Sequence, residues 1–264
     1  MNNFEKQYYE NSSFWTLDAL DDDNNKERII QTANLIPKDV KTLADIGCGN
    51  GIFLKHLKDN NPDIETIGVD RSESALSFYE GQKTIGDIAL LPFKDNAFDC
   101  VTCLEVIEHL PVPVYITALK ELCRISKKYV IISVPFQEKI ENSYTKCPSC
   151  LSMFNHELHL RRYEKADMNS LLIKFDFKSL SMQTLGTSWR YYGHELYSRI
   201  FYPKNKNKWC SPICPICGFN ESPSKIVNNN NVQRSWISYI SVLPKLFWPK
   251  KYRHYWIMSL YEKV

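Results

Sequence analysis

The stretch Leu43–Gly51, LADIGCGNG, decides the fold of this chain. Its apolar start is typical of a buried strand, and three glycines alternate with other residues shortly after Asp45. A helix-like run, GIFLKHL, follows at once. Glycine permits a tight turn and a close approach of ligand to main chain, because a side chain would occupy that space. The stretch therefore predicts a strand, a ligand-binding turn and a helix in succession.

Short apolar runs alternate with amphipathic runs from Lys41 to Val134. Their order is LADI, GIFLKHL, ETIGVD, ESALSFY, DCVTCL, ITALKELCRI and YVIISV. Such alternation predicts a parallel sheet with helices on both faces, and ligands bind at the carboxyl ends of its strands. A strand-like DFKSLSM and a final YWIMSLYEKV, which alternates like a closing strand, complete the expected sheet.

The second predicted strand, ETIGVD, ends in Asp70, about 20 residues beyond the glycines. A carboxylate at this place can accept hydrogen bonds from both hydroxyl groups of a ribose. The glycines alone are also compatible with a tight turn that binds nothing. Together with the acidic strand end, they indicate a nucleoside-binding site.

The run Asp45-Ile-Gly47-Cys-Gly49-Asn-Gly51 resembles the first motif of class I methyltransferases that use S-adenosylmethionine (SAM). Its spacing differs from the GxGxxG of dinucleotide-binding proteins. Gly86-Asp87-Ile88 resembles the adenine-contacting segment of that family, and LPFKDNAFDCVTCLEVIEHL resembles its fourth strand and the preceding loop. The resemblance covers roughly Ile46 to Val134 and the last strand. It implies a doubly wound, mostly parallel, Rossmann-like α/β sheet of seven strands and a SAM-dependent methyltransferase.

The resemblance also implies roles for the matching residues. The glycine turn would face the methionine part of SAM, Asp70 the ribose, and Glu105 the rim near the methyl donor. Asp87 and Ile88 would contact the adenine. The expected cofactor-binding residues are Asp45, Gly47, Cys48, Gly49, Asp70, Arg71, Asp87, Ile88 and Glu105. A polar and aromatic segment near the N-terminus is a candidate lid over the cofactor, or packs on the sheet: Tyr8, Tyr9, Phe14 and Trp15.

Glu105, Glu108 and His109 lie three and four residues apart in LEVIEHL, so a helix there would place them on one face. Two carboxylates and an imidazole can hold a divalent cation such as Mg²⁺ or Mn²⁺. The pattern resembles metal-dependent methyltransferases of the 2′-hydroxyl at RNA 3′ ends, where a later histidine, here His159, completes the site. Without a metal, His109 or His159 is the candidate base, because imidazole titrates near neutrality. The expected catalytic residues are His109, His159 and Glu108.

Of the nine cysteines, four lie in the first half of the chain and five lie between Cys147 and Cys217. Four lie in apolar strand-like or helix-like runs and are expected to be buried thiols: Cys48, Cys100, Cys103 and Cys123. Cys147-Pro-Ser-Cys150 and Cys214-Pro-Ile-Cys217 are CPxC knuckles, whose turns direct pairs of thiolates at one point. Two knuckles supply four ligands for a structural Zn²⁺, with Cys210, His156 or His159 as alternative ligands. We expect this zinc to shape the substrate pocket.

Residues 1–184 and 254–264 are expected to form the SAM-binding domain, with an insertion at 185–253. This insertion, with the Cys147–Cys150 loop, would form a small substrate- and zinc-binding module. It contains Gly218, an asparagine run at Asn228–Asn231 and several prolines. Its basic, aromatic part, SWISYISVLPKLFWPKKYRHYW, is typical of packing against a neighbouring domain. Contact with a membrane surface, single-stranded nucleic acid or glycan rings is the alternative.

The length of 264 residues, 44% of them hydrophobic, suffices for one large domain and a small module. A net charge of +3 is too small to require a nucleic-acid or anionic-membrane partner. The segment Met1–Asp23 lacks a signal-peptide pattern, and the sequence shows no apolar run long enough to cross a bilayer. We therefore expect a cytoplasmic protein.

These patterns favour an O-methyltransferase, or an N-methyltransferase, acting on a small metabolite or a glycan intermediate. A hydroxyl acceptor is favoured because histidines flank the expected site in place of an Asn-Pro-Pro-Tyr type motif for planar amines. One alternative is a metal-dependent 2′-O-methyltransferase of RNA 3′ ends, which the small net charge disfavours. Another is a catalytically silent docking protein with a SAM-binding fold, which the intact glycine turn and acidic strand ends disfavour.

Overall fold

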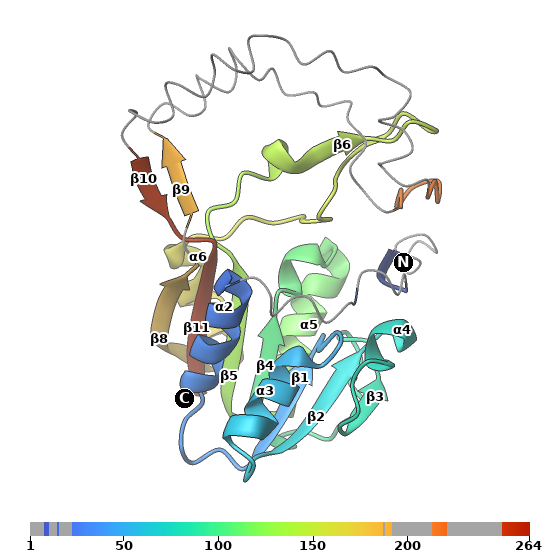
Figure 1. Cartoon of the computed structure of the whole chain (residues 1–264). Coiled ribbons are helices and arrows are strands. Elements are labelled where there is room, and N and C mark those ends of the chain that lie inside the picture. The colour runs from blue at the N-terminus through green and yellow to red at the C-terminus, as the bar shows by residue number, and fades with distance from the viewer. Residues whose placement is uncertain (1–7, 11–14, 16–22, 187, 192–212, 221–249) are drawn as a thin grey trace. The chain divides into compact units, whose positions relative to one another are not determined.

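The computed structural model describes residues 8–10, 15, 23–186, 188–191, 213–220 and 250–264. The chain divides into two units, whose elements are labelled in Figure 1. The larger unit comprises Tyr9–Lys139, His159–Gly186 and His254–Val264, and the smaller one comprises Met1–Tyr8, Ile140–Leu158 and Thr187–Arg253. Three expected features lie outside the described residues, namely Phe14, Cys210 and Asn228–Asn231, as does most of the basic, aromatic segment.

A seven-stranded sheet in the order β3-β2-β1-β4-β5-β11-β8 forms the centre of the larger unit (Figure 1). Strands β1 to β5 run parallel, and β11 runs antiparallel to both of its neighbours. The expected doubly wound, mostly parallel α/β sheet is therefore confirmed. The strand order reverses between β1 and β4, where ligands bind in folds of this kind. The bounds are β1 Thr42–Ile46, β2 Glu65–Asp70, β3 Lys83–Ile85, β4 Phe98–Leu104, β5 Ser126–Pro135, β8 Phe177–Leu185 and β11 Trp256–Lys263.

Helices cover both faces of this sheet. Neighbouring strand residues point to opposite faces, so Leu43 packs in one apolar cluster and Ala44 in the other. The Leu43 cluster takes side chains from α2 and α3, and the Ala44 cluster takes them from α5 and α6. The helices are α2 Asp23–Asn34, α3 Ile52–Asn60, α4 Glu73–Leu76, α5 Val112–Ile125 and α6 Lys165–Ser170, with 3-10 helices η3 Ile107–His109 and η5 Ile173–Phe175. The four cysteines expected in the core are all buried.

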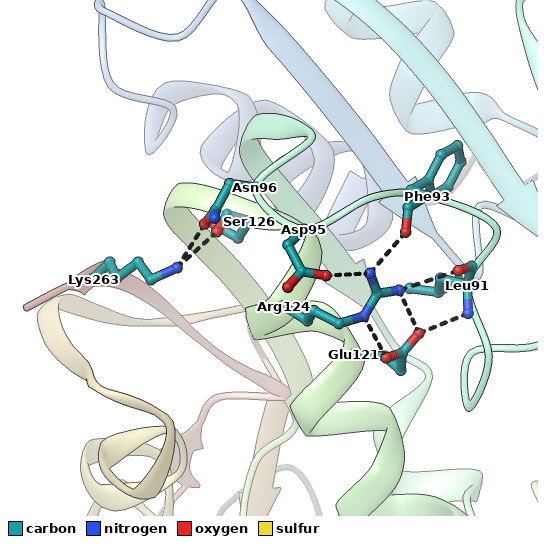
Figure 2. A network of polar contacts seen from close by, with 8 residues as sticks. All are labelled: Leu91, Phe93, Asp95, Asn96, Glu121, Arg124, Ser126 and Lys263. Carbon is teal, nitrogen blue, oxygen red and sulfur yellow. Dashed lines mark hydrogen bonds and ion pairs between the residues drawn. The ribbon is translucent and has the colours of Figure 1, made fainter.

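Arg124, in the last turn of α5, fastens the loop between β3 and β4, as Figure 2 shows. Its guanidinium donates to the carbonyls of Leu91 and Phe93, at 3.2 and 2.7 Å, and to the Asp95 carboxylate at 2.9 Å. Glu121 accepts from the guanidinium at 2.6 and 2.8 Å and from the Leu91 amide at 2.8 Å. This loop follows directly on the segment expected to contact adenine, and two side chains of α5, Glu121 and Arg124, fix its conformation.

The smaller unit contains two antiparallel strand pairs, β6 with β7 and β9 with β10. Its elements are η4 Ile140–Ser143, β6 Tyr144–Lys146, β7 Met153–Asn155, β9 Ser188–Tyr191 and β10 Lys250–Arg253. Residues 140–158 belong to it, so it takes in more of this region than the Cys147–Cys150 loop. Its role as a substrate- and zinc-binding module stays a prediction. Within the described ranges, no helix is both long and apolar enough to span a membrane.

Candidate functional site

The glycine-rich turn lies at the carboxyl end of β1 and leads into α3. Gly47, Gly49 and Gly51 have φ angles of 79°, 55° and 72°, in the left-handed region that favours glycine. A Cβ on Gly47 would lie 2.3 Å from Cγ2 of Val106, and one on Gly49 would lie 2.7 Å from the Trp15 ring. Both the backbone conformation and the surrounding space thus require glycine, as expected for a turn whose main chain is closely approached.

Asp70, the last residue of β2, is bonded to this turn. Its Oδ2 accepts from the amide of Gly49 at 2.8 Å, and its Oδ1 accepts from the amide of Ser72 at 2.9 Å. Burial raises the pKa of the Asp70 carboxyl, and the two amide donors act in the opposite direction. Each oxygen of an ionised carboxylate can accept a further hydrogen bond. The acidic strand end therefore retains the capacity to bind a diol.

Asp45 is buried beside the turn. Its Oδ1 accepts from the hydroxyl of Thr102, on the neighbouring strand β4, at 2.6 Å. Burial raises the pKa of this carboxyl to about 7. A cation next to such a group favours its ionised form.

Of the residues expected at the adenine, Asp87 is exposed and accepts from the amide of Ala89, and Ile88 is half-buried.

Tyr9 contacts both the segment that follows β2 and the imidazole of His109. Its carbonyl accepts from the hydroxyl of Ser72 at 2.9 Å and from the indole N–H of Trp15 at 2.6 Å. The guanidinium of Arg71 lies over its ring, 4.8 Å from the centroid. The same ring meets the imidazole of His109 edge-on, with the centroids 6.1 Å apart. This placement is compatible with a lid, a role that stays a prediction.

The LEVIEHL run does not form an α-helix that would carry its polar residues on one face. Glu105 follows β4 with a φ of 58°, and the helical part is the single 3-10 turn Ile107–His109. The Ser133 hydroxyl donates to Glu105 Oε1 at 2.8 Å, and the Glu105 amide donates to the Ser133 carbonyl at 3.0 Å. Glu105 is thereby fastened to β5.

Glu108, His109 and His159 come together although His159 is distant in sequence. One ligand atom from each lies within 4.8 Å of the others. Glu108 is 0% exposed, and within the described part of the chain neither carboxyl oxygen has a hydrogen-bond partner. Its Oε1 lies 3.8 Å from Nε2 of His109, and the two imidazole centroids are 4.7 Å apart. Burial, with repulsion from Glu105, raises the pKa of Glu108 well above its usual range.

Two residues near this cluster were missed by sequence reasoning. Glu138 lies shortly after β5, and its Oε2 is 2.5 Å from Nδ1 of His159. Arg28 of α2 lies over the ring of Trp256, 5.4 Å from the centroid. Burial raises the pKa values of Glu105 and Glu108, and the charge of Arg28 acts in the opposite direction. The sequence offered a signal for Glu138, because this residue follows a central strand at the carboxyl edge of the sheet. It offered none for Arg28, which is one of many basic residues.

In the smaller unit the four knuckle cysteines converge as expected. The sulfur atoms of Cys147 and Cys217 are 3.7 Å apart, those of Cys150 and Cys214 are 3.8 Å apart, and all four lie within 4.8 Å of one another. Zinc–sulfur bonds of about 2.3 Å in a tetrahedron separate the sulfurs by roughly 3.8 Å. The donor set and its spacing therefore fit Zn²⁺. The alternative ligands His156 and His159 lie outside this group.

The two knuckles share one backbone pattern. The first cysteine of each donates its amide to the carbonyl five residues on, from Cys147 to Ser152 at 2.9 Å and from Cys214 to Phe219 at 2.7 Å. Its carbonyl accepts from the amide four residues on, which belongs to Leu151 or Gly218. Those two residues have φ angles of 62° and 76°. Leu151 adopts a conformation that favours glycine, so the two knuckles form the same turn although their residue types differ at this position.

Residues 44–133 match the family model of the methyltransferase domain. They include the glycine turn, the end of β2 and the LEVIEHL run. Residues 44–133 are thus similar to methyltransferase domains, and the chain has the fold of class I SAM-dependent methyltransferases. The matched region excludes His159 and all four knuckle cysteines, so the domain match does not bear on these residues.

Two individual proteins are similar to part of this chain. An uncharacterized protein of Methanocaldococcus jannaschii is 36% identical over 123 residues, which are 43% of this chain and 52% of that protein. A ubiquinone biosynthesis O-methyltransferase of Thiobacillus denitrificans is 35% identical over 89 residues, 30% of this chain and 37% of the relative. The chain thus spans about half or less of the length of these relatives.

A solved SAM-dependent methyltransferase from Archaeoglobus fulgidus has the same fold as the methyltransferase domain. Its TM-score is 0.54 at 17% sequence identity, over 99% of this chain and 98% of that one. The class I methyltransferase fold expected from the sequence is confirmed.

Proposed function

We propose that this chain is a SAM-dependent methyltransferase that methylates a hydroxyl, or alternatively an amine, of a small metabolite or a glycan intermediate. The observation that carries the proposal is the bond between the glycine turn and Asp70, at the carboxyl edge of the sheet where Glu108, His109 and His159 also gather. The name of the Thiobacillus relative, an O-methyltransferase, supports a hydroxyl acceptor.

The residues of the turn fit SAM. Asp70 would bind the ribose hydroxyls, and the main chain at Gly47 and Gly49 would lie against the methionine part. The buried Asp45 carboxyl would gain stability from the positive charge of the cofactor. Arg71 and Cys48 would lie near the bound cofactor, and Glu105 would form the rim near the methyl donor. Asp87 and Ile88 would contact the adenine.

SAM supplies an electrophilic methyl group on a sulfonium, and the protein positions the acceptor and excludes water. Tyr9 and Trp15 would exclude water by closing over the turn. The acceptor hydroxyl must lose its proton as it attacks, and Glu108, His109 and His159 form the group of side chains that would take it. An imidazole is suited to this step because its pKa lies near neutrality.

We also propose that Cys147, Cys150, Cys214 and Cys217 hold a structural Zn²⁺. The spacing of their sulfur atoms and the matching turns support this assignment. Binding energies of structural zinc, about 10 to 16 kcal/mol, are coupled to folding. The metal would therefore order the smaller unit and, through it, the part of the chain expected to shape the acceptor pocket.

Methylation of RNA 3′ ends is the second candidate, because Glu108, His109 and His159 do converge. The net charge of +3 offers little attraction for a phosphate backbone. A silent docking protein is disfavoured by the geometry of the glycine turn and Asp70.

The test begins with calorimetric titration of the full chain with SAM. The protein is then incubated with methyl-labelled SAM and separate pools of hydroxylated metabolites, amines, oligosaccharides and RNA 3′-end oligonucleotides. Label in the metabolite or oligosaccharide pool is the expected result. Label in RNA alone would establish the second candidate. A folded chain that does not bind SAM would refute both and leave the docking protein.

A further inference from the structure

Three aliphatic side chains of the larger unit are exposed close to the candidate catalytic cluster. Val112 is 74% exposed, Ile116 is 56% exposed and Leu160 is 57% exposed. A single exposed aliphatic residue is ordinary, whereas several at one place mark a surface that binds a partner. The position of these three residues and the charges around them indicate what that partner is.

Helix geometry and one backbone bond bring the three residues together. Val112 and Ile116 are four residues apart in α5, so they lie on the same face of this helix. The amide of Leu160 donates to the carbonyl of Glu108 at 2.8 Å, in the 3-10 turn that comes just before α5. Leu160 is thereby held beside the start of α5, next in sequence to His159. We call the surface formed by Val112, Ile116 and Leu160 the α5 rim.

Arg161 places a positive charge at the α5 rim. Its guanidinium lies over the ring of Tyr115, 4.0 Å from the centroid, and donates to the carbonyl of Leu110. Both contacts leave the positive charge in place, because neither partner is a carboxylate. The next residue, Arg162, is paired with Glu164 and adds little net charge.

The exposed face of α5 adds a second positive charge. Lys120 is exposed and lies one turn beyond Ile116, on the same face of the helix. Glu121 is the only acidic residue of α5, and it is 9% exposed and paired with Arg124. The face that α5 presents to solvent is therefore aliphatic in its first turns and basic beyond them.

We propose that the α5 rim binds the surface of a bilayer that contains anionic lipids. The aliphatic side chains enter the boundary between headgroups and hydrocarbon, where their burial is favourable. Lys120 and Arg161 meet the lipid phosphates, because long basic side chains extend along apolar surface and keep their charge in water. Single-stranded nucleic acid would bind the basic groups and leave the aliphatic ones exposed. A second copy of the chain, paired through the same surface, would bring like charges together.

The position of the α5 rim gives this binding a role in the reaction. Leu160 follows His159 directly and is bonded to the backbone of Glu108, so the bilayer surface would lie beside the cluster that takes the proton. A hydroxylated acceptor that carries a hydrocarbon chain could then reach the cluster without leaving the membrane. This role rests on the proposed function, whereas binding to the bilayer does not.

The test measures flotation of the full chain with vesicles of phosphatidylcholine, alone or mixed with phosphatidylglycerol. We expect binding to the mixed vesicles, and added salt should weaken it. Ile116→Asp should weaken this binding by at least about tenfold, because a charge replaces an aliphatic contact. Lys120→Gln should weaken it by about fivefold. Ile173→Asp is the matched control, since Ile173 is also 57% exposed but precedes β8 at the amino end of the parallel strands, and it should bind as wild type does.

The inference is wrong if folded wild type does not float with the mixed vesicles, or if Ile116→Asp and Ile173→Asp have equal effects. A wild-type dimer in sedimentation velocity that Ile116→Asp dissociates would assign the α5 rim to a second copy instead. Circular dichroism establishes that each variant is folded.

SAM titrations of the same samples separate the two proposals. SAM binding without vesicle binding rejects only the membrane surface, and vesicle binding without SAM binding rejects only the methyltransferase. Methyl-labelled SAM, added with vesicles of a total membrane lipid extract, tests the role in the reaction. Label should enter the organic phase with wild type and fall with Ile116→Asp, and label confined to water-soluble acceptors would exclude a membrane-held acceptor.

Discussion

The backbone amide of Gly49 donates a hydrogen bond of 2.8 Å to the Asp70 carboxylate. This bond joins the turn after β1 to the end of β2. The second carboxylate oxygen accepts from the amide that follows Arg71, so one side chain fixes both segments. The relationship explains why an acidic residue is needed at this strand end even before a ribose is considered.

Replacing Asp70 by Asn should weaken SAM binding by about 10- to 100-fold, as expected from loss of one or two charge-assisted hydrogen bonds. The amide group cannot accept at both positions. Asp99 is a matched control, because its Oδ2 accepts from the amides of Lys41 and Thr42, both at 3.0 Å, at the opposite end of β1. Asp99→Asn should lower the Tm and leave SAM affinity unchanged. Equal SAM affinities of the two variants would place the cofactor elsewhere.

SAM binding should depend on pH through Asp45. Burial raises the pKa of its carboxyl to about 7, so the carboxyl is partly protonated at neutral pH. A bound cation favours the carboxylate, so binding should release a proton and tighten as the pH rises from about 6 to 8. Calorimetry in buffers of different ionisation enthalpy measures the released proton. Asp45→Asn should abolish the release, and an unchanged release in this variant would assign it to another group.

The same carboxyl affects stability without cofactor. Because the folded pKa is raised, the contribution of Asp45 is most favourable below its ordinary pKa of 3.8 and declines as the pH rises to about 7. The Tm of wild type relative to Asp45→Asn should therefore fall across this window. Asn keeps an acceptor for the Thr102 hydroxyl, so the comparison isolates the charge. A constant difference in Tm between pH 4 and 7 would contradict the raised pKa.

The sequence was most informative where local backbone geometry and chemistry coincide. The alternating glycines after β1 and the acid at the end of β2 each have a local reason, a left-handed φ or a strand end, and both were found. The knuckle cysteines were also found, because each CPxC turn is a short-range structure. Their convergence across a long stretch of sequence was expected because a structural Zn²⁺ takes four ligands and each knuckle offers two.

The candidate catalytic cluster was only partly predictable. Residue spacing predicted that Glu105 and Glu108 share one helical face, but Glu105 has a left-handed φ and its carboxylate is hydrogen-bonded to Ser133 instead. Glu138 and Arg28 reach the cluster only through the order of the strands and the packing of α2. Such contacts depend on tertiary structure and leave no periodic pattern in the sequence.

Removing the guanidinium of Arg124 should loosen the loop that leads from the adenine segment to β4. Arg124→Ala leaves the carbonyls of Leu91 and Phe93 without this donor, and we expect a loss of about 1 to 3 kcal/mol in the free energy of unfolding. SAM affinity should fall less than in Asp70→Asn. Lys128→Ala, which removes an exposed pair with Asp39, should leave the Tm unchanged. Equal effects of the two variants in denaturant titrations would show that the network does not stabilise the fold.

Loss of one knuckle thiolate should unfold the smaller unit and spare the larger one. Cys214→Ser removes a zinc ligand, so bound zinc should fall from about one per chain toward zero, with a lower Tm for the transition of that unit. Cys123→Ser is the matched control, because this thiol is 5% exposed within the core of the sheet domain and belongs to no knuckle. It should lower stability by about 1 to 2 kcal/mol and keep the zinc. Elemental analysis and calorimetry measure both quantities. SAM binding should persist in Cys214→Ser, and a wild-type chain purified without zinc under reducing, chelator-free conditions would contradict the metal assignment.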